Sequence, residues 1–117
     1  MADDDELELL RGTVDLLVLR ALAWGPRHGY AIAKWIRSAS REALAVEDRA
    51  LYIALHRLEA RTLIRGAWER TPGGRRARTY QLTPAGRARL TAAVSSWERY
   101  VRAMQHVLSA TVAEEGG

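Results

Sequence analysis

Residues 47–61 read EDRALYIALHRLEAR. Leu51, Leu55 and Leu58 recur at helical spacing, which predicts an amphipathic helix with one narrow apolar stripe. Glu47 or Asp48 can accept the free N–H groups of its first turn. The other side of this helix carries mostly basic and aromatic residues, namely Arg49, Tyr52, Ile53, His56, Arg57 and Ala60.

Such a helix suits a DNA major groove, where protein side chains read base edges. An ordinary amphipathic helix with a solvated basic face has the same pattern, so the rest of the chain must decide between these two interpretations. All eighteen Lys and Arg residues lie between Arg11 and Arg102, whereas seven of the fourteen acids lie near the two ends. The acid-poor middle of the chain therefore predicts a polyanionic partner.

The length of 117 residues predicts one small domain. The chain has no cysteine, which excludes a disulfide framework, a thiol nucleophile and a cysteine-bound metal. No apolar run approaches the roughly 18 residues of a membrane span. The first residues are acidic where a signal peptide would be basic, so we expect a cytoplasmic protein.

Two helices are predicted ahead of this segment. The first covers residues 9–24 and ends at Gly25, which adopts a left-handed conformation, and Pro26, which cannot continue the helix. The second covers residues 29–38. Its expected buried side consists of Ile32, Trp35, Ile36 and Ala39. The connection over residues 40–46 is polar but contributes two expected core side chains, Leu44 and Val46.

A basic hairpin is predicted to follow. Residues 63–70 and 76–82 alternate in character, and Thr71-Pro72-Gly73-Gly74 between them is typical of a turn. The hairpin has a single acid, Glu69, against five arginines: Arg65, Arg70, Arg75, Arg76 and Arg78. A solvated hairpin with scattered charge is the simpler interpretation. The charge density favours contact with phosphates or a minor groove, principally through Arg75, Arg76 and Arg78.

The last predicted helix begins with Thr83 as its cap and Pro84 at its first position, and it runs to about Ser109. Apolar residues recur along it in a heptad pattern: Leu90, Val94, Trp97, Val101, Met104 and Leu108. This seam could pack on the first helix of the same chain. Its length favours an interface between two copies of the chain, so we expect a homodimer.

Trp97 lies in the middle of this seam, so its two copies would approach each other near a dimer axis. With Tyr100 it forms a candidate pocket for a small aromatic effector. A packed interface tryptophan is the alternative interpretation, and the sequence leaves both open.

Three helices, a basic hairpin and a long final helix predict a mainly α fold, a winged helix-turn-helix with a C-terminal dimerisation helix. We expect an acidic flexible tail over residues 1–8 and a DNA-binding domain over residues 9–83. The dimerisation helix then covers residues 84–109, and a second flexible tail covers residues 110–117.

At this level of detail the sequence resembles the PadR family of bacterial transcriptional regulators, in its short form with one C-terminal helix. Four blocks carry the resemblance: LRGTVDLLVL at residues 10–19, GPRHGYAI at 25–32, LYIALHRLE at 51–59 and RRARTYQLTPAG at 75–86. The resemblance implies a homodimeric repressor that binds a palindromic operator and is often released by a small molecule.

The chain departs from the family pattern at three positions. Ala50 stands where the family usually has Ser or Thr, which removes a hydroxyl that could reach a phosphate. Ile53 replaces a usual Pro and offers an apolar contact to a thymine methyl. Thr62 replaces a common Gly in the turn after the recognition helix. These departures concern the operator sequence more than the fold.

Two other classes of function compete with this interpretation. A winged helix that only docks a protein partner needs no basic hairpin, so the arginines disfavour it. An enzyme would need a nucleophile–base pair, a metal-ligand spacing or a phosphate-binding loop, and we identify none of these. We therefore expect double-stranded DNA as partner, with no catalytic residue, metal or cofactor.

Overall fold

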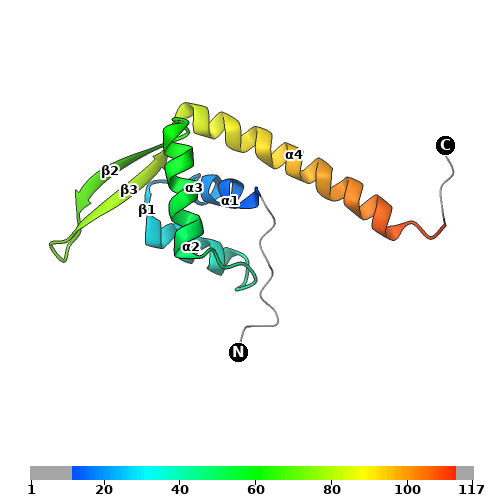
Figure 1. Ribbon diagram of the computed structural model, residues 1–117, viewed down its shortest axis with the longest axis horizontal. Helices are drawn as coiled ribbons and strands as arrows, with labels where there is room; N and C mark the ends of the chain where they lie inside the picture. Colours follow the sequence, from blue (N-terminus) through cyan, green and yellow to red (C-terminus); the bar gives the residue numbers. More distant parts are fainter. Residues whose placement is uncertain (1–11, 113–117) are drawn as a thin grey trace.

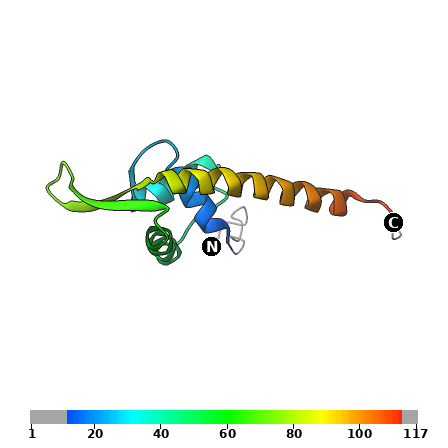
Figure 2. The same ribbon diagram turned by 90° about the horizontal axis from the view of Figure 1, so that it is seen from above.

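The computed structural model describes residues 12–112 and consists over that range of four helices and three strands (Figure 1). The helices are α1 (Thr13–Ala21), α2 (Gly29–Ala39), α3 (Asp48–Ala60) and α4 (Pro84–Ser109). The strands are β1 (Arg27–His28), β2 (Ile64–Arg70) and β3 (Arg76–Leu82). The β2–β3 hairpin and α4 extend in opposite directions from the cluster of α1, α2 and α3 (Figure 1, Figure 2). This mainly α, winged helix-turn-helix architecture is the one predicted from the sequence.

The core lies where the three short helices meet the base of the hairpin and the start of α4. Leu51, Leu55 and Leu58 of α3 are buried as predicted, while Tyr52 and Ile53 on the same helix stay exposed. Residues three and four apart share one helix face, so burial of the leucine stripe leaves the other face free. The largest fully buried side chains are Val18, Leu19, Leu22, Ile32, Ile36, Leu58 and Ile64.

The first helix is shorter than predicted at its N-terminal end. It begins at Thr13, directly after Gly12, whose φ of +86° lies in the left-handed region. A residue in that conformation is incompatible with a right-handed helix, so α1 starts after it. Residues 9–11 of the predicted helix lie outside the described residues.

The prediction is also too long at the other end, because α1 stops at Ala21 rather than at Trp24. The N–H groups of Ala23 and Gly25 donate to carbonyls three residues earlier, which makes a tighter turn than an α-helix. Gly25 has a φ of +138°, a region that glycine adopts readily, in agreement with its predicted place at the helix end. Trp24 is exposed in this turn, with the Arg20 guanidinium 5.0 Å from its ring centre.

The second helix ends one residue later than predicted, at Ala39. Ile32 and Ile36 are buried and Trp35 is half-buried, but Ala39 is exposed, contrary to the prediction. Ala39 is the last helical residue, where the chain turns away from the core. The connection to α3 supplies two side chains to the core region as predicted, Leu44 and Val46.

The predicted hairpin is confirmed, and it belongs to a three-stranded sheet. β2 and β3 pair antiparallel, from Ile64 opposite Leu82 at the base to Arg70 opposite Arg76 at the tip. β1 pairs with the other edge of β3, which gives the strand order β1-β3-β2. The sequence did not predict β1, because two residues are too few to show an alternating pattern.

The start of α4 is fixed by the predicted cap. The hydroxyl of Thr83 accepts a hydrogen bond from the N–H of Gly86 at 3.0 Å and donates one to the carbonyl of Thr62 at 2.7 Å. Pro84 occupies the first helical position, where its missing N–H costs nothing. The cap of α4 is thereby tied to the turn that follows α3.

That turn contains a strained residue, because Thr62 has a φ of +57°. β-Branched side chains rarely adopt this conformation, whereas glycine does so freely. We expect Thr62→Gly to raise the free energy of unfolding by roughly 0.5–1 kcal/mol, since relief of strain exceeds the added flexibility of the unfolded chain. Urea unfolding measures this. Thr71→Gly is the control, because Thr71 lies in the hairpin turn and has no positive φ. This control should lower the free energy of unfolding. If Thr62→Gly lowers it by the same amount, the backbone at Thr62 is not strained.

Candidate nucleic-acid interface

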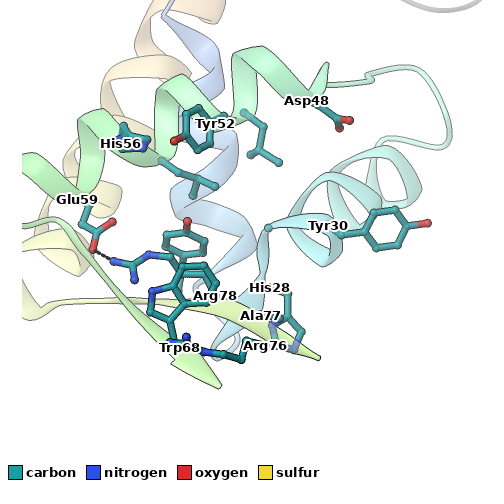
Figure 3. A pocket seen from close by; sticks show the side chains of 14 residues that line it. His28, Tyr30, Asp48, Tyr52, His56, Glu59, Trp68, Arg76, Ala77 and Arg78 are labelled. Carbon is teal, nitrogen blue, oxygen red and sulfur yellow. Dashed lines mark hydrogen bonds and ion pairs between the residues drawn. The ribbon is translucent and has the colours of Figure 1, made fainter. Parts of the chain in front are cut away.

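The exposed face of α3 presents the side chains expected of a DNA-reading helix. Arg49, Tyr52, Ile53 and His56 are all exposed, with Tyr52 61% and Ile53 48% accessible. The rings of Tyr52 and His56 meet edge to face with centres 4.4 Å apart, so these two side chains form one aromatic ridge. In Figure 3 both project from α3 above the hairpin.

The N-terminus of α3 differs from one expectation. Glu47 is the capping residue, but its side chain makes no capping hydrogen bond. Asp48 lies in the first turn, where a negative charge interacts favourably with the helix dipole. Ala50 is half-buried against the core, so this departure from the family pattern lies at the edge of the exposed face.

One face of the hairpin changes from apolar at its base to basic at its tip. Successive opposed pairs on this face are Ile64 with Leu82, Gly66 with Tyr80, Trp68 with Arg78, and Arg70 with Arg76. Alternate residues of a strand point to the same side, so these four pairs share a face. Its base joins the core, and its tip carries two exposed arginines.

The hairpin arginines differ in what they contact. Arg75 is exposed beside the turn, and Arg76 is exposed with its guanidinium 5.1 Å from the Trp68 ring centre. Arg78 is half-buried, and its Nη2 donates to Glu59 Oε2 at 2.6 Å. Arg75 and Arg76 are therefore exposed at the tip of the hairpin, whereas Arg78 is held by an ion pair within the chain.

Arg57, a predicted DNA contact, also has a partner inside the chain. Its guanidinium donates two hydrogen bonds to Asp15 of α1, one of them from Nε to Oδ2 at 3.0 Å. These hydrogen bonds, together with the negative charge of Asp15, raise the pKa of Arg57 above its ordinary value. The ion pair connects α1 to the last turns of α3.

A groove of about 780 Å³ separates α3 from the hairpin (Figure 3). Tyr52, His56 and Glu59 line it on the side of α3, and Trp68 and Arg76 line it on the side of the hairpin. Tyr80 lies at its buried end, and burial raises the pKa of its phenol although the charge of Arg78 opposes this. The groove thus has aromatic walls and an arginine at its outer rim.

The other face of the hairpin is tied to β1. The Thr79 hydroxyl donates to Glu69 Oε1 at 2.9 Å and lies 3.0 Å from His28 Nδ1. Because this hydroxyl has a single proton, which goes to Glu69, the contact requires His28 Nδ1 to carry a hydrogen and donate it. The sequence shows Glu69 only as the single acid of the hairpin, so these contacts were not predicted.

The predicted seam of α4 divides into two parts. Leu90 is only 7% exposed and lies in the core, and Val94 is half-buried against it. This corrects the prediction for Leu90, because the chain's own core covers it and leaves nothing there for a partner. Beyond Val94 the seam is open: Trp97 and Met104 are exposed, Val101 is half-buried and Leu108 is 76% exposed.

A second groove, of about 670 Å³, lies between the start of α1 and α4. Trp97 and Tyr100 line it from α4, with ring centres 5.9 Å apart, and Thr13 and Leu16 line it from α1. The two residues of the candidate effector pocket are therefore brought together in one groove. Among residues 12–112 no group of His, Cys, Asp or Glu could hold a metal ion. In the same range no helix is long and apolar enough to cross a membrane.

The three helices, the basic hairpin and the exposed face of α3 define a winged-helix protein of the kind found in transcriptional regulators. The model of the PadR-like family of transcriptional regulators matches residues 18–92. The chain belongs to this family, as its sequence blocks predicted.

Individual relatives agree with this assignment. A transcriptional regulator of Mycobacterium tuberculosis is 40% identical over 85 residues, which are 72% of this chain and 75% of that protein. The crystal structure of a PadR family transcription regulator from Clostridium difficile is 28% identical with a TM-score of 0.74, and the match covers 84% of this chain and all of that one. A transcriptional regulator from Clostridium thermocellum is 29% identical with a TM-score of 0.75, covering 82% and 93% of the two chains.

Proposed function

We propose that the protein represses transcription by binding a palindromic operator in double-stranded DNA as a homodimer, and that a small aromatic effector releases it. In this proposal residues 9–83 form the DNA-binding domain and residues 84–109 the dimerisation helix. We expect the protein to act in the cytoplasm.

The observation that carries the proposal is the shared groove between α3 and the hairpin. The aromatic ridge of Tyr52 and His56 borders it on one side, and Arg76 borders it on the other. Sequence-specific DNA binding requires side chains that contact base edges and others that contact phosphates. The exposed face of α3 suits the first role, and the hairpin arginines suit the second. A winged helix that only docks a protein has no need of this arrangement.

The outer half of α4 supports a homodimer. Trp97, Val101, Met104 and Leu108 follow a heptad pattern, and none of them belongs to the core of the described chain. A contiguous apolar stripe on a projecting helix is unusual for a monomer in water, and a second copy of the same helix covers it with matching spacing.

The effector part of the proposal rests on the groove between α1 and α4. Its aromatic wall of Trp97 and Tyr100 suits a flat ligand. Asp15 lies on α1 between groove-lining residues and binds Arg57 of α3, so a ligand that shifts α1 would also shift the recognition helix.

We expect Tyr52→Ala and His56→Ala each to weaken binding to a duplex enriched from a random pool by about 1–3 kcal/mol, the size of a lost base contact. Binding to a scrambled duplex should fall much less, because phosphate contacts dominate there. Fluorescence anisotropy at fixed salt measures both affinities.

Trp24→Ala is the matched control, since it removes an exposed aromatic ring that does not line the groove. It should leave both affinities unchanged. If Tyr52→Ala and His56→Ala bind the enriched duplex as tightly as the parent protein, α3 is not the reading helix.

A further inference from the structure

The guanidinium of Arg78 contacts groups from three elements, α3, β2 and β3. Nη2 of Arg78 donates a hydrogen bond to Glu59. Its Cζ atom lies 5.5 Å from the ring centre of Trp68 and 5.9 Å from the ring centre of Tyr80. These distances allow cation–π attraction on top of the ion pair. In Figure 3 the dashed line from Glu59 crosses from α3 to the hairpin at this point.

Gly66 makes room for this arrangement. A Cβ atom placed on Gly66 would lie 2.7 Å from Arg78 Nε and 2.9 Å from its Cζ and Nη2. Such approaches do not occur in folded proteins, so any larger residue would push the guanidinium away from Glu59. The N–H of Gly66 also donates to Glu59 Oε2 at 3.3 Å, which gives the carboxylate a second contact with the hairpin.

Glu59 is therefore a clamp between the recognition helix and the hairpin. It lies in the last turn of α3, and both groups that it accepts from belong to the β2–β3 hairpin. Its side chain and that of Arg78 are each about one-third exposed, at 33% and 31%. Partial burial and the second hydrogen bond, from the Gly66 N–H, make this pair stronger than an open surface ion pair.

The charge of Glu59 makes its position notable. A carboxylate in the groove proposed to face DNA repels phosphates, so simple electrostatics disfavours an acid there. Arg78 neutralises it, so the positive charge of Arg78 is balanced within the chain. The two opposite charges therefore cancel within the proposed DNA-binding groove, and the pair adds no net positive charge to attract DNA.

We propose that Glu59 and Arg78 are positioning residues, which fix the angle between α3 and the hairpin so that both can engage one DNA site at the same time. This inference rests on the proposed function. It assigns Arg78 a role different from the direct DNA contact expected from the sequence, and it gives Glu59 a role that sequence reasoning did not consider.

The positioning role and simple electrostatics predict opposite changes in DNA affinity when Glu59 is neutralised. Glu59→Gln removes a negative charge and frees the charge of Arg78, so electrostatics alone makes DNA binding tighter. The positioning role makes the variant bind the enriched duplex more weakly, by roughly fivefold, because the hairpin and α3 no longer hold their relative orientation. Binding to a scrambled duplex, which follows charge, stays the same or becomes tighter.

Two further variants sharpen the comparison. Arg78→Lys keeps the positive charge but loses the planar guanidinium that stacks on the aromatic rings. If Arg78 is a positioning residue, this variant should weaken binding to the enriched duplex as Glu59→Gln does. If Arg78 only contacts a phosphate, lysine should replace it with little loss of affinity. Glu69→Gln is the matched control, because it removes an acid of the hairpin that accepts a hydrogen bond from Thr79 of the hairpin itself. It should tighten binding to both duplexes or leave both unchanged.

Urea unfolding separates positioning from stability, since a merely structural role lowers stability and both affinities together. Equal or tighter binding of Glu59→Gln to the enriched duplex would overturn the positioning role. A parent protein that does not prefer the enriched duplex would instead overturn the proposed function, so the two failures are distinguishable.

Discussion

Gly86→Ala should destabilise the protein by about 3 kcal/mol or more, at or above the upper end of the usual cost of overpacking a core. Gly86 is buried in the first turn of α4, and a Cβ atom there would lie 1.9 Å from the carbonyl oxygen of Leu63. That oxygen accepts the N–H of Thr83, so the added methyl displaces the start of α4 and breaks the contact that anchors it. Urea unfolding followed by circular dichroism measures the loss.

The hairpin turn offers a matched control for this change. In Gly73→Ala the same methyl meets only the Thr71 hydroxyl, at 4.0 Å, and the φ of Gly73 is not positive. It should change stability by less than about 0.5 kcal/mol, as surface substitutions usually do. If Gly86→Ala is as stable as Gly73→Ala, α4 does not pack against Leu63 as described.

The double variant Val101→Glu with Met104→Lys should be monomeric and should lose binding to the enriched duplex. Both side chains lie on the open half of the α4 seam, so in a dimer the new charges are buried at a cost of several kcal/mol unless they pair. In the single chain neither residue belongs to the core, so we expect the monomer to remain folded. Sedimentation velocity at micromolar concentration and circular dichroism measure these two properties.

Ser95→Glu with His106→Lys places the same two charges on exposed positions of α4 opposite the seam. This control should sediment and bind as the parent protein does. A parent protein that sediments as a monomer, or a seam variant that stays dimeric, would refute the proposed interface.

Local pattern was sufficient to predict most of the fold. The leucine stripe of α3, the Thr-Pro-Gly-Gly turn and the Thr83 cap each act over a few residues, so the sequence displays them directly. β1 and the early end of α1 were missed for the opposite reason. A two-residue strand exists only because β3 lies beside it, and the apolar period of α1 continues through the turn that ends the helix.

The roles of the arginines could not be predicted in the same way. Helix-face geometry predicts Arg57 as a DNA contact and the charge density of the hairpin predicts Arg78, but neither pattern shows their partners Asp15 and Glu59, which lie 42 and 19 residues away in the sequence. Only the folded arrangement brings these pairs together. The same holds for the seam of α4. A heptad pattern shows which apolar side chains share one face of the helix, but it does not show whether a partner or the chain's own core buries them. The chain's own core buries Leu90.

Selection of bound duplexes from a random pool is the decisive experiment on sequence-specific DNA binding, because it requires no assumption about the operator. We expect enrichment of a palindrome whose half-sites are centred about one helical turn apart, roughly 10 base pairs, or a multiple of it, because two-fold symmetry pairs the recognition helices. Enriched duplexes that bind no better than the starting pool would contradict sequence-specific recognition by this protein.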